Sequence, residues 1–387
     1  MTRVLKFGGT LLADEVRRAR VLADVENAVS TGEVPVVVVS AMGRRGDAYA
    51  TDTLLGLLEA EAGPPDPHVR DLMLSAGEVI STALVAHLAS SRGIRAAPLT
   101  ATDAGLRAAR RDGRPVLREV ATDRLRDVLA RGAVPVVAGF QALDESGRVM
   151  TLGRGGSDLT AVALGAALGV PVEVVKEVPG VMTCDPALST SARTLRRISY
   201  RGLHRLAVLG NRVVQPDAVA LGQRLGVPMT VRHVGRRWGT TVTTTETIEL
   251  VPYDDVAAFG FACATDLTLV RCRDPELLAS FGVDPDCGLV LGDEAVLCLD
   301  APIAERARAA APTVLTDSVP GCARVSVVGD DDRLSSSWIL DARRVLREEG
   351  VPVLFCFHDR HAANFVVPDG FVAVVISRLN CLASATL

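Results

Sequence analysis

Lysine is nearly absent from this chain of 387 residues. The 42 basic residues are 40 arginines and only two lysines, Lys6 and Lys176. On a solvated surface arginine and lysine can replace one another, so a coding bias can convert most surface lysines to arginine. A compact ammonium is harder to replace where chemistry requires it, because guanidinium is wider, planar and differently hydrated. The two remaining lysines are therefore the first candidates for functional residues.

Several other features that would define a class of protein are missing. The formal net charge is −4 and no run of basic residues occurs, which argues against a nucleic-acid or anionic-membrane partner. No stretch of about 18 apolar residues and no secretory signal is found, so we expect no membrane span and a cytoplasmic location. The eight cysteines include no Cys-x-x-Cys pair, and seven of them follow residue 260. We expect reduced thiols and no metal site, since the nearest match, Cys356-x-His358-x-x-His361, fits no common closed site.

The first 245 or so residues alternate apolar runs with amphipathic helical patterns. Strand then helix, repeated, predicts a mainly parallel sheet with helices on both faces. The polar stretch 141–151 predicts an inserted hairpin. The predicted strands are 4–7, 34–40, 134–139 and 172–175, and the predicted helices are 14–29, 71–90, 123–131 and 158–168.

The composition changes at residues 234–251, where a threonine-rich connector occurs. Beyond it, shorter strands and helices recur in two rounds, which predicts a pair of small regulatory modules. We therefore expect two regions, 1–245 and 246–387. The elements predicted in the second region are strands 257–262, 267–272, 295–300, 324–328, 351–357 and 363–367 and helices 275–281 and 335–349.

The first candidate site is the segment Lys6-Phe-Gly8-Gly9-Thr10, placed where a strand ends. Two adjacent glycines leave the backbone bare, so its N–H groups can approach an anionic oxygen closely. A lysine just before them can place its ammonium on a transferring phosphate. The alternative is a tight turn with a surface lysine, and the scarcity of lysine favours the functional interpretation.

The second candidate site is Gly153-Arg154-Gly-Gly-Ser157-Asp158, followed directly by an Ala/Leu-rich helix. An arginine and a Ser-Asp pair near a helix N-terminus predict a site for anions and hydroxyls, in which Arg154 can hold a carboxylate with two hydrogen bonds. Asp158 could instead be only a helix cap.

Two further segments complete the set of candidates. Ser40 ends a predicted strand, and Thr51 opens a helix after a glycine-punctuated loop, which places hydroxyls at the carboxyl edge of the sheet, where ligands bind. Glu78 lies in an apolar helix and needs a cationic partner, for which a substrate ammonium is one candidate.

Taken together, these segments resemble the aspartate kinases of the amino acid kinase family across essentially the whole chain. The resemblance implies an α/β fold: an αβα sandwich kinase domain with a mainly parallel sheet, followed by two small ferredoxin-like ACT domains that commonly form homo-oligomers. It also implies transfer of the ATP γ-phosphoryl group to the β-carboxylate of L-aspartate, with Mg²⁺. The motifs that carry it are KFGGT at 6–10, VVSAMGRRGDAYATDTLLGL at 38–57, SAGE at 75–78, GRGGSD at 153–158, VPGVMTCDP at 178–186 and the QP of GNRVVQP at 210–216.

The resemblance also assigns roles to residues. Lys6 would stabilise the transferring phosphoryl group, Asp158 would organise the catalytic end, and Gly8 and Gly9 would approach the phosphates. Arg154 would hold the α-carboxylate of the substrate and Glu78 its α-ammonium. Further substrate hydrogen bonds would come from Ser40, Thr51 and Ser157, and the nucleotide side would comprise Lys176, Glu177, Met182 and Arg212.

The departures from the family pattern lie mainly on the nucleotide side. The usual Thr-Asp pair is replaced by Lys176-Glu177, and the usual arginine after Asp-Pro by Ala187. Arg212 stands for the usual lysine, and Leu11 for the usual serine after KFGGT. Lys176 either supplies a cation to the nucleotide from a new direction or pairs with Glu173 or Glu177 at a strand end.

The second small module also departs from the pattern. Asp330, Asp331 and Asp332 replace a glycine-rich loop, and Ser335 could cap the helix that follows. Three carboxylates there would repel an amino acid's carboxylate, so we expect weak or absent inhibition by lysine and threonine. Two alternatives to a specialised aspartate kinase stay open: a kinase for a related amino acid, and a non-catalytic regulatory homologue.

Overall fold

A computed structural model describes residues 2–111, 113–190, 192–211, 213–244, 259–274, 288–291, 294–329, 334, 336–358 and 362–385. The chain forms two compact units, which are described separately below. The first unit comprises residues 1–181, 196–200 and 213–248, and the second comprises 182–195, 201–212 and 249–387. The units therefore interleave along the chain, because two segments that precede residue 245 pack with the second unit.

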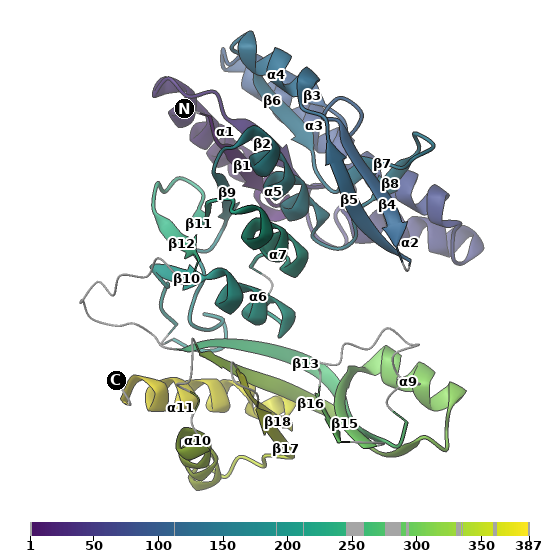
Figure 1. Cartoon of the computed structure of the whole chain (residues 1–387), viewed down its shortest axis with the longest axis vertical. Coiled ribbons are helices and arrows are strands. Elements are labelled where there is room, and N and C mark those ends of the chain that lie inside the picture. The colour runs from purple at the N-terminus through teal and green to yellow at the C-terminus, as the bar shows by residue number, and fades with distance from the viewer. Residues whose placement is uncertain are drawn as a thin grey trace. The chain divides into compact units, whose positions relative to one another are not determined.

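The first unit is built on an eight-stranded sheet in the order β10-β12-β11-β9-β1-β2-β6-β3 (Figure 1). Every neighbouring pair is parallel except β11 and β12. The central strands are short and rich in β-branched residues, as strands covered on both faces usually are. Their bounds are β1 Val4–Phe7, β2 Val36–Val39, β3 Ala96–Leu99, β6 Val134–Ala138, β9 Val172–Lys176, β10 Arg197–Ser199, β11 Met229–His233 and β12 Gly239–Thr243.

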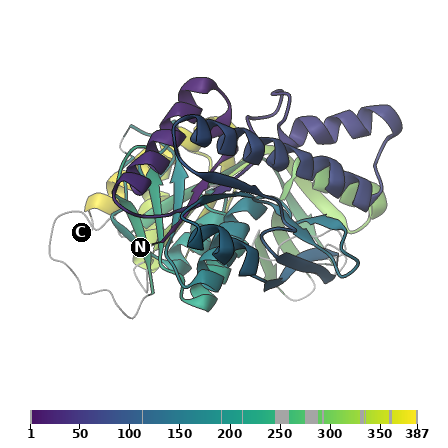
Figure 2. The ribbon, with the colours of Figure 1, turned by 90° about the horizontal axis from the view of Figure 1, so that it is seen from above.

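Helices cover both faces of this sheet, as the alternating pattern predicts. Side chains from α1 and α3 form one core with Leu5, Phe7 and Val175, and α5 packs on β1, β2 and β9 and against α7. In Figure 2 the purple helix α1 and the dark-blue helix α3 lie on one side of the sheet and the teal helices α5 and α7 on the other. The helix bounds are α1 Glu15–Ser30, α2 Thr51–Ala62, α3 Pro67–Ser91, α4 Asp123–Ala130, α5 Gly156–Leu168 and α7 Pro216–Leu225, and a short 3-10 helix spans Gly9–Leu12.

A second, four-stranded sheet lies beside α3 in the order β5-β4-β7-β8. Strands β7 (Gln141–Leu143) and β8 (Val149–Thr151) confirm the predicted hairpin. Strands β4 (Leu106–Arg111) and β5 (Arg114–Val120) were not predicted, because five arginines interrupt any regular apolar alternation in them. Asp71 of α3 fixes the sheet by accepting a hydrogen bond from Thr151 at 2.7 Å and pairing with Arg110 at 2.7 Å.

Helix α3 is long and apolar enough to span a membrane by length and composition alone. Half of its apolar window is buried within the fold, and it packs on β3, β6 and β8. The helix also carries the buried carboxylates of Asp71 and Glu78. Its apolar surface is therefore used to cover a sheet in the first unit.

The second unit is built on a six-stranded antiparallel sheet in the order β14-β15-β13-β16-β18-β17. Helices α10 and α11 bury one face of β16 and β18, and α9 packs on β13 and β15. The bounds are β13 Phe259–Cys272, β14 Gly288–Leu291, β15 Glu294–Asp300, β16 Leu315–Gly329, β17 Phe355–His358, β18 Ala362–Pro368, α6 Tyr200–Val208, α9 Ala301–Ala310, α10 Ser336–Glu348 and α11 Val372–Ala385.

The prediction of two separate strands at 257–262 and 267–272 is wrong. A single strand, β13, runs from Phe259 to Cys272 and pairs along its length with β16, whereas residues 257–258 lie outside the described residues. The pairing register shifts between Ala264 and Leu267, and Asp266 adopts a φ of 58°. An irregularity of this kind bends a strand without ending it, so the polar residues at 265–266 mark a bulge and not a turn. The expected helix at 275–281, residues 330–332 and Ser335 lie outside the described residues.

Candidate active site

The candidate site lies at the carboxyl ends of β1 and β2 and the N-terminus of α5. Leu5 and Phe7 are buried in the core shared with α1 and α3. Because side chains alternate along a strand, Lys6 points to the opposite face, which α5 covers. There its Nζ lies 2.6 Å from Oδ1 of Asp158, and both side chains are about 95% buried, at 6% and 5% exposed.

Asp158 is held from two directions. Its second oxygen, Oδ2, accepts a hydrogen bond from the backbone N–H of Gln215 at 3.1 Å. Burial acts to raise the pKa of Asp158, but Lys176, Lys6 and the bond from Gln215 outweigh it and hold the pKa below its ordinary value. The N-cap of α5 is Gly155, so the interpretation of Asp158 as only a cap is wrong: the carboxylate pairs with a lysine.

Gly9 sits against the loop that follows β2. Its carbonyl accepts a hydrogen bond from the N–H of Gly43 at 2.9 Å. A Cβ on Gly9 would lie 2.2 Å from the carbonyl oxygen of Ala41, which is backbone and cannot move aside. Gly8 is different, since a Cβ there would only approach Nζ of Lys6, at 4.0 Å. The second glycine therefore allows two loops of the site to touch.

Gly9→Ala should displace the loop that begins at Ser40, because the added methyl group cannot share space with the Ala41 carbonyl. We expect at least a tenfold loss of activity together with a lower melting temperature. Gly8→Ala is the matched control and should retain more of both. Equal activity and melting temperature for Gly9→Ala and the wild type would contradict the close approach.

Glu78 is buried on α3, with 2% exposure. One oxygen, Oε1, accepts a hydrogen bond from the backbone N–H of Ala41 at 2.9 Å, whereas Oε2 has no partner among the described residues. Burial raises the pKa of Glu78 to about 8, and it outweighs the backbone N–H groups of Ala41 and Glu78 and the charge of Lys6, which favour the ionised form. A buried carboxylate with one unsatisfied oxygen is suited to receive an ammonium group.

The other predicted acceptor-side residues surround this region with different exposure. Ser40 directly follows β2 and Thr51 is the first residue of α2, and both are half-buried. Ser157 is 5% exposed and packs against Gly139 at the end of β6. Arg154 is exposed in the turn before α5, and within the described part of the chain its guanidinium makes no ion pair. The structure thus places Arg154 near the N-terminus of α5 with its charge available.

Lys176 is the last residue of β9, and Glu177 follows it. Lys176 does not pair with Glu173 or with Glu177, the two partners expected from the sequence. Glu177 contacts Arg17 at 2.8 Å and Arg44 at 3.7 Å. Glu173 contacts Arg3 at 2.7 Å and Arg232 at 2.6 Å. Arginines thus hold both carboxylates that were the expected partners of Lys176.

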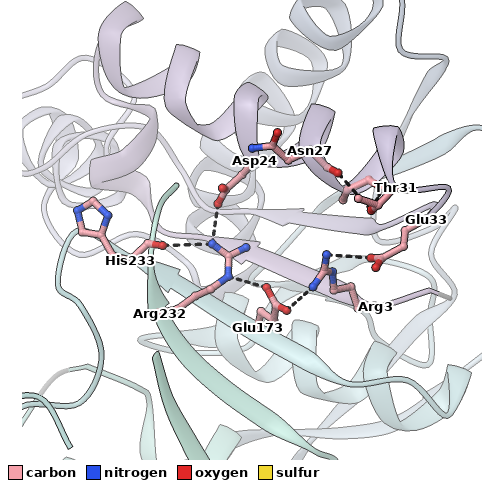
Figure 3. A network of polar contacts seen from close by, with 9 residues as sticks. Arg3, Asp24, Asn27, Thr31, Glu33, Glu173, Arg232 and His233 are labelled. Atoms are coloured by element: carbon pink, nitrogen blue, oxygen red, sulfur yellow. Dashed lines mark hydrogen bonds and ion pairs between the residues drawn. The ribbon is translucent and has the colours of Figure 1, made fainter. Parts of the chain in front are cut away.

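The Glu173 contacts belong to a larger, partly buried network (Figure 3). Arg232 joins Glu173 to Asp24 of α1 at 2.7 Å, and Arg3 joins Glu173 to Glu33 at 2.9 Å. This network lies on the α1 face of β9, the side opposite Lys6 and Asp158. It secures the strand that presents Lys176.

The remaining predicted residues divide between the two units. Met182 belongs to the second unit, where it forms a β-bridge with Thr194. Arg212 lies outside the described residues. Leu11, at the position of the usual serine, is 1% exposed in the core beneath α1 and α3, so its side chain contributes to packing. Ala187 is exposed in the second unit.

Two residues of the site act through their backbones and were not predicted from the sequence. Gln215 donates its N–H to Asp158, and Ala41 donates its N–H to Glu78. Gln215 is also the N-cap of α7, and its position before Pro216 was the available signal. Nothing in the sequence marks Ala41, because its side chain takes no part in the contact.

The chain belongs to the amino acid kinase family, whose model matches residues 1–233. Aspartokinase 1 of Bacillus subtilis (strain 168) is 41% identical over 242 residues, covering 62% of this chain and 60% of that protein. The aspartokinase of Geobacillus stearothermophilus is 40% identical over 230 residues, covering 59% and 55%. The matched parts thus span less than two thirds of these curated relatives.

Solved structures resemble the whole chain. E. coli aspartokinase III, in complex with aspartate and ADP, has a TM-score of 0.75 with 21% identity and covers 99% of each chain. The aspartate kinase from Synechocystis has a TM-score of 0.55 with 27% identity, covering 99% of this chain and 69% of that one. The architecture is therefore an amino acid kinase domain with a mainly parallel sheet, followed by a further sheet-containing region.

Proposed function

We propose that this protein is an aspartate kinase, which transfers the γ-phosphoryl group of ATP to the β-carboxylate of L-aspartate and produces 4-phospho-L-aspartate. The observation that carries the proposal is the arrangement around α5 and α3. A buried Lys6–Asp158 pair stands beside two glycines, and the Glu78 carboxylate retains an unpaired oxygen. The names of the curated relatives and the complex of E. coli aspartokinase III with aspartate and ADP support the choice of substrates.

The acceptor would be held by its α-amino acid end. Glu78 would receive the α-ammonium on Oε2, and Arg154 would bind the α-carboxylate with two parallel hydrogen bonds. Hydroxyls of Ser40, Thr51 and Ser157 would supply further hydrogen bonds. Holding both charged groups leaves the β-carboxylate as the nucleophile and fixes its direction of approach.

The phosphoryl step needs little covalent help from the protein. An oxygen of the β-carboxylate forms a bond to the γ-phosphorus while the bond from that phosphorus to the β–γ bridging oxygen breaks, and ADP leaves. No proton is transferred, because the acceptor is already ionised. Lys6 would neutralise charge on the transferring group, and the bare backbone of Gly8 and Gly9 would lie against the phosphates. Asp158 would hold the Lys6 ammonium in place.

An ATP-dependent amino acid kinase is expected to use ATP together with Mg²⁺. Among the described residues, no group of three or more His, Cys, Asp or Glu side chains could hold a metal ion. Both Asp158 oxygens are engaged by Lys6 and Gln215. Without a cage of protein ligands, a Mg²⁺ ion would be held mainly by the phosphates of the nucleotide, which is how this ion usually binds in kinase sites. When bound, the ion would neutralise phosphate charge.

Three further parts of the proposal concern the setting of the enzyme. The region from residue 246 onward would form a tandem pair of ACT domains, and the antiparallel sheet with helices on one face supports this. That region would mediate homo-oligomerisation. The protein would act in the cytoplasm, where ATP is available.

A hydroxamate assay tests the proposal, because acyl phosphates react with hydroxylamine. The purified protein should give a coloured hydroxamate with ATP, Mg²⁺ and L-aspartate. D-Aspartate, L-glutamate and L-lysine serve as comparison acceptors, and GTP as a second nucleotide. Product with a different amino acid only would identify a kinase for a related acceptor, and no product with any acceptor would favour a non-catalytic homologue.

A further inference from the structure

We propose that Lys176 is a second phosphate-binding cation, which faces the nucleotide from β9 and together with Lys6 flanks Asp158. This inference rests on the proposed function, since it assigns a role within the same site. It concerns a residue at which the chain departs from the pattern that it otherwise resembles. The geometry around β1, β9 and α5 carries it.

The register of the sheet places the two lysines on the same face. Strands β1 and β9 are parallel neighbours, with Lys6 opposite Val174 and Phe7 opposite Val175. Phe7 and Val175 both belong to the core that α1 and α3 cover. Because side chains alternate, Lys6, Val174 and Lys176 all point to the face that α5 covers.

Asp158 belongs to the helix that covers these lysines. It sits in the first turn of α5, which packs on both β1 and β9. Its carboxylate contacts Lys6 directly and is drawn to a lower pKa by both Lys176 and Lys6. Two ammonium groups therefore share one carboxylate, which leaves a net positive charge at the N-terminus of a helix.

No other described carboxylate neutralises Lys176. Glu173 points to the α1 face of the sheet, where Arg3 and Arg232 hold it (Figure 3). Glu177 is held by Arg17 and Arg44. On the neighbouring strand β11, the residue opposite Lys176 is His233, which is not a carboxylate.

Two ammonium groups beside one carboxylate are unfavourable when the site is empty, which indicates that an anionic ligand binds there. Burial and the nearby charge of Lys6 lower the pKa of Lys176 to about 8, although Asp158 acts in the opposite direction. A second ammonium that is partly withdrawn from water destabilises the protein when no ligand is bound. A phosphate group would supply the missing negative charge, and the cluster would then be satisfied.

The test measures Mg·ADP and Mg·ATP binding by calorimetry for the wild type, Lys176→Met and Lys176→Arg. We expect a 10- to 100-fold weaker affinity for Lys176→Met and a smaller loss for Lys176→Arg. The melting temperature of Lys176→Met without ligand should equal or exceed that of the wild type, because a desolvated charge is removed. Arg224→Met, which removes an exposed cation from α7, is the control for loss of charge and should bind nucleotide normally.

Two outcomes overturn the inference. Unchanged nucleotide affinity in Lys176→Met shows that the ammonium does not contact phosphate. A lower melting temperature with parallel losses of nucleotide and aspartate binding shows a structural role only. Failure of the proposed function is recognised separately, since the wild type would then form no acyl phosphate whatever the variants bind.

Discussion

Lys6→Met should lower the rate constant for acyl phosphate formation by about 10²–10³-fold, the loss typical of removing one preorganised electrostatic contact from a transition state. The Lys6 ammonium is buried, lies 2.6 Å from Asp158 and stands beside the Gly8 backbone. Its charge therefore acts in a site with little water to screen it. The measurement is the initial rate of hydroxamate formation at saturating ATP and aspartate.

Three controls accompany the Lys6 variant. Lys6→Arg keeps the charge but not the compact shape, so it should recover only part of the lost rate. The melting temperature should stay near that of the wild type, because Asp158 retains Lys176 and the Gln215 N–H as partners. A Lys6→Met protein with the wild-type rate would remove this residue from the chemistry.

Glu78→Gln should raise the KM for aspartate by about 10²-fold or more, because the variant loses the charge that receives the substrate ammonium. Gln keeps the size of the side chain and an oxygen that can accept from Ala41. The measurement is KM and kcat for aspartate in the hydroxamate assay. A KM within twofold of the wild-type value would exclude Glu78 from the acceptor site, and Glu59→Gln, on the exposed face of α2, is the matched control.

The same variant should change how stability and binding depend on pH. The pKa of Glu78 is about 8 in the folded protein and 4.5 as its ordinary value. Between these values the folded state binds more protons than the unfolded state, so the stability of the wild type falls as pH rises toward 8. Glu78→Gln removes that fall and should melt at a higher temperature than the wild type at pH 8, with little difference at pH 4. Below pH 8, aspartate binding to the wild type should release a proton, and this release should be absent from the variant.

The sequence predicted the parts of the fold that depend on regular patterns. Short apolar runs became β1, β2, β6 and β9, and the polar interruption at 141–151 became a hairpin. It could not predict the arginine-rich hairpin of β4 and β5. That hairpin is stabilised by a contact across the fold, between Arg110 and Asp71, which no local pattern reveals. Strand β13 was divided in two for a related reason, since a bulge and a turn use the same polar residues.

The candidate site was predictable where side chains act and unpredictable where backbones act. The pairing of Lys6 with Asp158 joins two segments that were identified separately as anion sites. The bonds from Ala41 and Gln215 depend on loop geometry, so their residue types carry no signal. The pairing of Lys176 with a neighbouring glutamate was a reasonable expectation from spacing alone. It failed because Glu173, three residues before Lys176 in the strand, points to the opposite face, and because arginines on other elements hold both Glu173 and Glu177.

The two lysines on the α5 face have a practical consequence for chemical labelling. They carry the only aliphatic side-chain amines among the 387 residues. Aldehydes and activated esters that modify side-chain amines therefore have targets at the proposed phosphate site and at no other side chain. Because its pKa is lowered to about 8, Lys176 is unprotonated more often at neutral pH than an ordinary lysine, and its amine therefore reacts faster. In most proteins labels on side-chain amines report on the whole surface, whereas in this one both side-chain amines belong to the proposed phosphate site.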